Sequence, residues 1–159
     1  MYANLYGSLR EMLLAPADFF VELRKGLKKQ LPAGLRDFRT TRGRGRLMKV
    51  YFGEPAFHYE AWHHTGAGRL EVGLHFEGSA AENLAAFEFF RSRMVEVKAN
   101  LPRAELEPWD RGWSRLYETM LAARLDGAVV DDAVECLSAY IVTLQPLLDQ
   151  FLRSRDENS

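Results

Sequence analysis

Histidine and glutamate alternate with apolar residues along two neighbouring segments, and these residue types support metal binding and acid–base chemistry. The segments are 57–63 (FHYEAWH) and 69–77 (RLEVGLHFE). The second alternates apolar and polar residues strictly, which predicts a strand with one buried face. Thr65-Gly66-Ala67-Gly68 lies between them and predicts a tight hairpin turn.

The hairpin register decides whether these polar residues meet. A turn centred on Gly66 and Ala67 pairs residues whose numbers sum to 133, so that His58 faces His75. One side of the hairpin then carries His58, Glu60, Glu71, His75 and Glu77. Directly paired Cβ atoms lie about 4.5–5.5 Å apart, so two imidazoles and a carboxylate could hold a divalent metal, or a carboxylate could act as a general base. The candidate catalytic residues are His58, Glu60, Glu71 and His75, and Trp62 would line one side of the site. The candidate metal ligands are His58 and His75.

Three alternatives stay open for this hairpin. The polar side could be the solvated face of a half-buried sheet. It could line a ligand pocket without a metal. A register slip of one residue would separate the set, and His63 and His64 at the turn could be the only exposed imidazoles.

A second candidate site is the basic segment Arg24 to Lys49. It holds ten Lys/Arg and one acid, Asp37, a formal charge of +9 within a chain whose net charge is −1. Arg42, Arg44 and Arg46 alternate with glycines that allow close backbone approach, and arginine binds phosphate oxygens bidentately. We expect these three arginines to contact a polyanion, with support from Lys28, Lys29 and Lys49.

The sequence therefore favours a non-enzymatic binding or accessory module that engages a polyanion, nucleic acid above all, through residues 24–49. No cofactor is expected on this interpretation. The alternatives are a small-ligand or metal-dependent enzyme on the hairpin, in which a divalent metal is the cofactor, and a structural homodimer. A solvated helix face with a flexible loop is the simplest explanation of the basic segment.

The cysteine count and the hydropathy pattern indicate the cellular compartment in which the protein is expected. The single cysteine, Cys136, excludes an intrachain disulfide and is typical of a reducing compartment. Arg10 and Glu11 interrupt the apolar run at the beginning of the sequence, and no apolar stretch reaches about 18 residues, so neither a signal peptide nor a membrane span is expected. The expected location is the cytoplasm.

The remaining patterns predict the elements that position these residues. Helices are expected over 2–14, from Pro16 to about Leu31, from the Ser79–Glu82 capping box to Pro102, and from a cap at Asp131 or Asp132 onward. Strands are expected over 47–52, 57–63, 69–77, about 104–109 and 112–119, with a helix from Ser114 as the alternative to the last. The segment 40–46 (TTRGRGR) is expected to be a loop, and Pro146 should bend the last helix.

The order α-α-β-β-β-α-β-β-α predicts an α+β fold with an antiparallel sheet of about five strands and helices packed on it. Residues 1–152 are expected to form a single domain and 153–159 a polar tail that frays. Apolar residues at 134–151 follow a heptad-like spacing, which would suit core packing or a homodimer.

Overall fold

The structure, a computed structural model, describes residues 10–42 and 45–158. Its helices are α2 (Pro16–Gln30), α3 (Ala80–Arg91), α4 (Met94–Asn100) and α5 (Gly127–Glu157), with short 3-10 turns at Ala33–Leu35, Thr65–Ala67 and Asp110–Gly112. Its strands are β1 (Arg39–Arg42), β2 (Leu47–Tyr51), β3 (Phe57–His64), β4 (Arg69–Phe76), β5 (Glu105–Pro108) and β6 (Ser114–Leu121).

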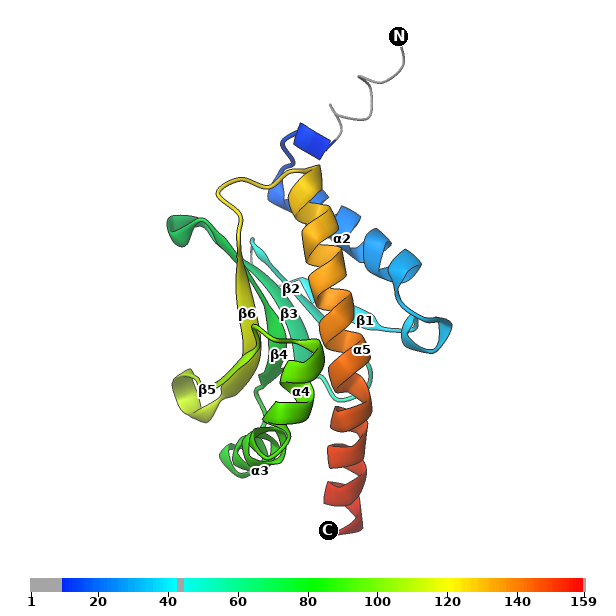
Figure 1. Cartoon of the computed structure of the whole chain (residues 1–159), viewed down its shortest axis with the longest axis vertical. Helices are drawn as coiled ribbons and strands as arrows, with labels where there is room; N and C mark the ends of the chain where they lie inside the picture. Colours follow the sequence, from blue (N-terminus) through cyan, green and yellow to red (C-terminus); the bar gives the residue numbers. More distant parts are fainter. Residues whose placement is uncertain (1–9, 43–44, 159) are drawn as a thin grey trace.

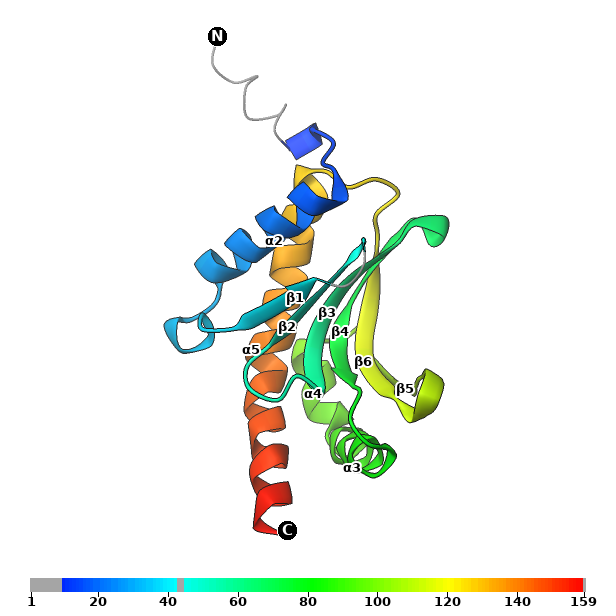
Figure 2. The ribbon, with the colours of Figure 1, turned by 180° about the vertical axis from the view of Figure 1, so that it is seen from behind.

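The strands form one antiparallel sheet in the order β1-β2-β3-β4-β6-β5, and the helices lie on one of its faces (Figure 1). The predicted α+β class is confirmed, with six strands where about five were expected. Figure 2 shows the other side, where the strands lie in front of α5. Leu70, Val72, Leu74 and Phe76 point from β4 into the helix layer and are fully buried, so the alternate residues of β4 point to the helix-free face.

The sixth strand is β1, which falls within the segment predicted to be a loop. Thr40 and Thr41 pair with Val50 and Lys49 of β2. Its four residues have little apolar alternation of their own, so pairing with β2 rather than local pattern makes this edge strand. Residues 43 and 44 lie outside the described part of the chain.

Helices α2 and α3 begin where predicted, but the helix predicted to continue to Pro102 is divided into α3 and α4. Pro16 is the first residue of α2, and the Ser79–Glu82 capping box begins α3. The helix predicted to continue to Pro102 is interrupted after Arg91, where Ser92 Oγ donates to the Phe89 carbonyl (2.8 Å). Such local side-chain bonds compete with the helical pattern.

Two expectations at the chain's outer helices need correction. The last helix begins after Asp126, whose carboxylate accepts from the Val129 amide (3.0 Å), and neither Asp131 nor Asp132 is its cap. The segment predicted as a helix over 2–14 lies outside the described residues up to residue 9. Arg10 and Glu11 are helical as predicted, whereas Leu13 forms a β-bridge with Asp126.

The long helix α5 packs along the sheet and against α2 (Figure 1). The heptad-spaced residues Val134, Leu137, Ile141, Leu144, Leu148 and Phe151 are all buried. The stripe is therefore covered by the chain's own sheet and helices, and the homodimer prediction cannot rest on it. The helix runs past the predicted boundary at residue 152, and Arg155 pairs with Glu54 and Glu82. Among the described residues, no helix combines the length and apolar character needed to cross a bilayer.

Candidate metal centre

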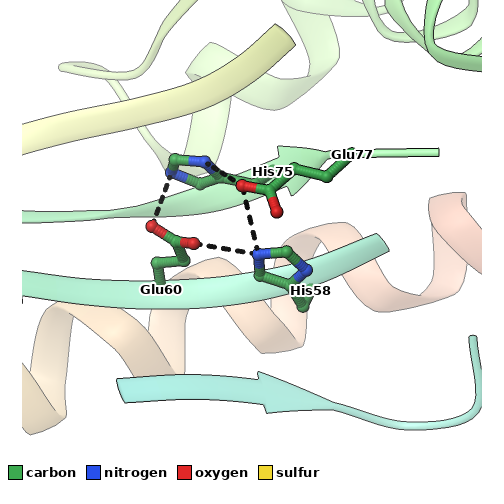
Figure 3. Close-up of side chains that lie close together, drawn as sticks. All are labelled: His58, Glu60, His75 and Glu77. Atoms are coloured by element: carbon green, nitrogen blue, oxygen red, sulfur yellow. Dashed lines mark hydrogen bonds and ion pairs between the residues drawn. The ribbon is translucent and has the colours of Figure 1, made fainter. Parts of the chain in front are cut away.

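The β3–β4 hairpin has the register predicted from its turn. His58 pairs with His75, Glu60 with Gly73 and Trp62 with Glu71. His58, Glu60, His75 and Glu77 thereby converge on the helix-free face, and one possible ligand atom from each lies within 4.8 Å of the others (Figure 3). We call these four residues the His/Glu cluster.

The separations within the His/Glu cluster are short. His58 Nε2 lies 2.9 Å from Glu60 Oε1 and 3.7 Å from Glu77 Oε1. His75 Nε2 lies 3.5 Å from Glu60 Oε2, and His75 Nδ1 lies 3.7 Å from Glu77 Oε1. A tetrahedral ion with metal–ligand distances of about 2.0–2.2 Å would separate its ligands by comparable amounts, so only small side-chain shifts are needed to surround one.

The outer nitrogen of each imidazole is held by a group that fixes its orientation. His58 Nδ1 is 2.8 Å from the Pro55 carbonyl oxygen, which can only accept, so Nδ1 donates to it and Nε2 is directed at Glu60 in the cluster. His75 Nε2 is 3.1 Å from Glu71 Oε1. A proton on that nitrogen leaves Nδ1 as a lone-pair donor, and Nδ1 is buried without a hydrogen-bond partner among the described residues.

Glu71, predicted as a candidate site residue, therefore lies behind His75 rather than among the four. Arg115 Nη1 donates to its other oxygen, Oε2 (2.8 Å), and the Arg115 guanidinium is stacked between Trp109 and Tyr117, 3.6 and 3.9 Å from their ring centroids. Metal-binding histidines characteristically donate their second ring N–H to a carboxylate or carbonyl held in this way.

The predicted solvated face is wrong for these residues. The side chains of His58 and His75 are 2% exposed and that of Glu60 is 4% exposed, although no described helix covers this face. Neighbouring strands supply the cover: Lys49 from β2 on one side, and Arg115 and Tyr117 from β6 on the other. Gly73 lies opposite Glu60 and allows Tyr117 to pack closely against the strand. A Cβ at Gly73 would lie only 2.5 Å from Tyr117 Cβ.

The histidines at the turn also differ from expectation. His63 is buried, with Nε2 2.8 Å from the Ala122 carbonyl oxygen. His64 is partly exposed, lies against Trp62 with ring centroids 4.0 Å apart in a tilted arrangement, and is 3.1 Å from Glu71. Trp62 is thus a neighbour of His64 at the far end of the hairpin.

The charges around the cluster are unequal. Glu60, Glu71, Glu77 and Glu107 supply four carboxylates, whereas the fixed cations in contact with them are Lys49 and Arg115. With neutral imidazoles this network carries two uncompensated negative charges; Glu60 and Glu71 are buried, whereas Glu107 is 40% exposed. Bound protons or a divalent cation would reduce this excess.

The pKa values of His75, Glu77 and Glu71 are shifted by these neighbouring charges. Burial by itself would lower the pKa of His75, but the hydrogen bond to Glu71 and the nearby carboxylates of Glu77 and Glu60 outweigh burial and raise it to about 9. Burial would raise the pKa of Glu77, but His75 and Lys49 outweigh it and lower that pKa to about 2. The pKa of Glu71 is also lowered, because His75 and Arg115 outweigh its burial.

Of the described residues predicted to bind a polyanion, Lys28 and Lys49 lie on opposite faces of the sheet. Lys49 contacts Glu60 and Glu77 on the helix-free face, whereas Lys28 lies on α2 in the helix layer, 4.2 Å from the Phe38 ring centroid. Arg46 Nη1 is 2.9 Å from His63 Nδ1. Lys29 is exposed on α2, Arg44 and the side chain of Arg42 lie outside what the structure describes, and Arg42 contributes backbone to β1.

The sequence did not predict the roles that three residues have at this site. Glu77 was placed on the correct side but not among the ligands, although its two-residue spacing from His75 puts both on one face. Lys49 was assigned to the basic segment. Arg115 carried no local signal, because its contact with Glu71 depends on the pairing of β4 with β6.

Comparisons with known proteins do not identify the chain. No protein-family model, no curated protein and no solved structure matches it. Functional inference therefore rests on the geometry of the His/Glu cluster.

Proposed function

We propose that this protein binds a divalent transition-metal ion through His58, Glu60, His75 and Glu77. The observation that carries the proposal is the buried nitrogen His75 Nδ1, which has no hydrogen-bond partner in the described chain and faces Glu77 at 3.7 Å. A buried polar atom without a partner is costly. Because the pKa of His75 is raised to about 9, a bound cation would take the place of the Nδ1 proton at neutral pH and give this nitrogen its missing partner.

The donor set favours a particular class of ion. Two imidazole nitrogens and two carboxylate oxygens suit Zn²⁺, Fe²⁺ or Mn²⁺ better than Ca²⁺ or Mg²⁺, which prefer oxygen ligands alone. Both imidazoles have their outer nitrogens fixed, His58 by the Pro55 carbonyl and His75 by Glu71. Orientation of this kind lowers the cost of assembling the ligands around the ion.

The four protein ligands favour a closed centre. Structural zinc sites are filled by four protein ligands, whereas catalytic sites keep a position for water. The cluster's exposed fractions run from 2% for the histidines to 14% for Glu77. The proposal is therefore ion binding that stabilises the helix-free face, with no reaction assigned.

Equilibrium dialysis tests this proposal. Chelator-stripped protein is dialysed against Zn²⁺ or Mn²⁺ and its metal content is measured by mass spectrometry. We expect one ion per chain in the wild type and a large loss in His75→Gln. His63→Gln is the matched control, because His63 lies on the same strand pair and contacts Arg46 and the Ala122 carbonyl rather than the cluster or Glu71. Equal retention by the wild type and His75→Gln would refute the proposal.

Polyanion binding through the basic segment is a second proposal. Its supporting observation is that Arg24, Lys29 and Arg39 are exposed and form no ion pair within residues 10–42 and 45–158. Fluorescence anisotropy with labelled DNA and RNA at low and physiological salt tests it. Binding that weakens steeply with salt, with a smaller slope after replacement of Arg42, Arg44 and Arg46 by Ala, would support it. Absence of binding at low salt would refute it.

A further inference from the structure

Lys49 occupies the most exposed side of the His/Glu cluster. Its Nζ lies 2.9 Å from Glu77 Oε2 and 3.4 Å from Glu60 Oε1, so one ammonium bridges two of the proposed ligands. Its side chain is 27% exposed, more than that of any cluster member. The ammonium thus lies between solvent and the carboxylates that a metal ion would need.

The backbone keeps Lys49 at this position. Lys49 pairs directly with Glu60 across β2 and β3, and with Thr41 across β1 and β2. The strand therefore holds the Cα, while the four-carbon stem lets the ammonium move. Lysine is a compact point charge on a flexible stem, unlike the planar guanidinium of Arg115, which is clamped between two aromatic rings.

We propose that Lys49 is an internal competitor for the metal site, one that occupies the carboxylates of Glu60 and Glu77 until a divalent cation displaces it toward solvent. This inference rests on the proposed function, because it concerns the regulation of the same site. An ion within bonding distance of both carboxylates would face the ammonium at short range. Two cations at that distance repel each other, and the repulsion is weakly screened in a partly buried site.

Selectivity follows from the same competition. A monovalent ion brings no more charge than the ammonium that it must displace, whereas a divalent ion brings twice as much. Lys49 would therefore discriminate against monovalent ions and set the affinity for divalent ions. Removing the ammonium while keeping an unbranched stem should tighten divalent binding.

Titration of Lys49→Met with Zn²⁺ and Mn²⁺ by calorimetry tests this inference. We expect the affinity to rise about tenfold or more over the wild type, a change of about 1.4 kcal/mol or more. Lys98→Met is the matched control, because Lys98 pairs with Glu105 (3.4 Å) on the exposed surface and should leave the affinity unchanged.

A second measurement uses the wild type and does not depend on how the variant folds. Acetic anhydride labelling of Lys49, followed by mass spectrometry, should be faster with the metal bound than with chelator, because the ammonium is released from Glu60 and Glu77. Labelling of Lys29, which is exposed on α2, should not change.

The outcomes separate this inference from the proposed function. Metal binding by the wild type with equal or weaker binding by Lys49→Met, and unchanged labelling of Lys49, would overturn the competitor role and leave the metal site standing. Binding by Lys49→Met alone would support the competitor role and refute metal binding by the natural chain. Absence of binding by both proteins would overturn both proposals.

Discussion

The raised pKa of His75 predicts how the stability of the metal-free protein depends on pH. A group whose pKa is higher in the folded than in the unfolded chain stabilises the fold below its unfolded pKa and loses that contribution as pH rises through its folded pKa. For His75 these values are 6.5 and about 9. The stabilisation is therefore present at about pH 6 and fades toward alkaline pH.

The magnitude follows from the difference between the two pKa values. The full contribution corresponds to about 3 kcal/mol, of which about 2 kcal/mol is lost between about pH 6 and about pH 8.5. For a chain of this length that loss corresponds to a fall in Tm of about 4–8 °C. The ionised forms of Cys136 and Tyr140 are disfavoured by burial, which raises both of their pKa values, so these two groups add further losses at higher pH.

The assay is urea unfolding in the presence of chelator at the two pH values, for the wild type and His75→Gln. Glutamine can donate a hydrogen bond to Glu71 but does not titrate, so the difference between the proteins isolates His75 from Cys136 and Tyr140. We expect the wild type to lose about 2 kcal/mol more than the variant. Equal losses by both proteins would refute the account of the charge network.

Three further predictions concern the surroundings of the site and the fold. Gly73→Ala should destabilise the protein by about 2–3 kcal/mol in urea unfolding. The added Cβ would lie 2.6 Å from the Leu116 carbonyl oxygen and against Tyr117. An unchanged unfolding midpoint would contradict this packing. Glu71→Gln should weaken Zn²⁺ binding about 10–100-fold in calorimetry, and an unaltered affinity would mean that Glu71 does not orient His75. Asp126→Ala should cost about 1 kcal/mol of stability, whereas Asp132→Ala should cost little; the reverse order would contradict the cap assignment.

The hairpin could be predicted from sequence because its information is local. The alternation over 69–77 and the Gly66–Ala67 turn together define the register, and the structure has that register. Period-two patterning fixes which side chains share a face. The turn fixes which residues stand opposite each other, so His58 and His75 could be paired without knowledge of the rest of the fold.

The burial of the cluster could not be predicted, because it depends on strands distant in sequence. Lys49 arrives from β2 and Arg115 from β6, and each covers the cluster only after the sheet has assembled. The strand β1 was missed for a related reason: Thr40 and Thr41 are extended because β2 offers them partners. The Asp126 cap was missed because the Asp126-Gly127 pair is also typical of a turn.

Lys49 shows that the net charge of a sequence segment does not predict on which face of the fold each charge lies. Counted along the chain, Lys49 belongs to a segment of formal charge +9. In space it lies against Glu60 and Glu77, on the opposite face of the sheet from Lys28. Lys28 lies on α2 and Lys49 on β2, so these two charges of one basic segment lie on opposite faces of the sheet.

The most direct test of the metal centre is a crystal structure of the protein equilibrated with Zn²⁺, with anomalous data collected on both sides of the zinc absorption edge. The account predicts one anomalous peak on the helix-free face, within about 2.0–2.2 Å of His58 Nε2, His75 Nδ1 and a carboxylate oxygen each from Glu60 and Glu77. Lys49 should be displaced from those carboxylates. A map without a peak there, with His75 Nδ1 still lacking a partner, would contradict the central claim.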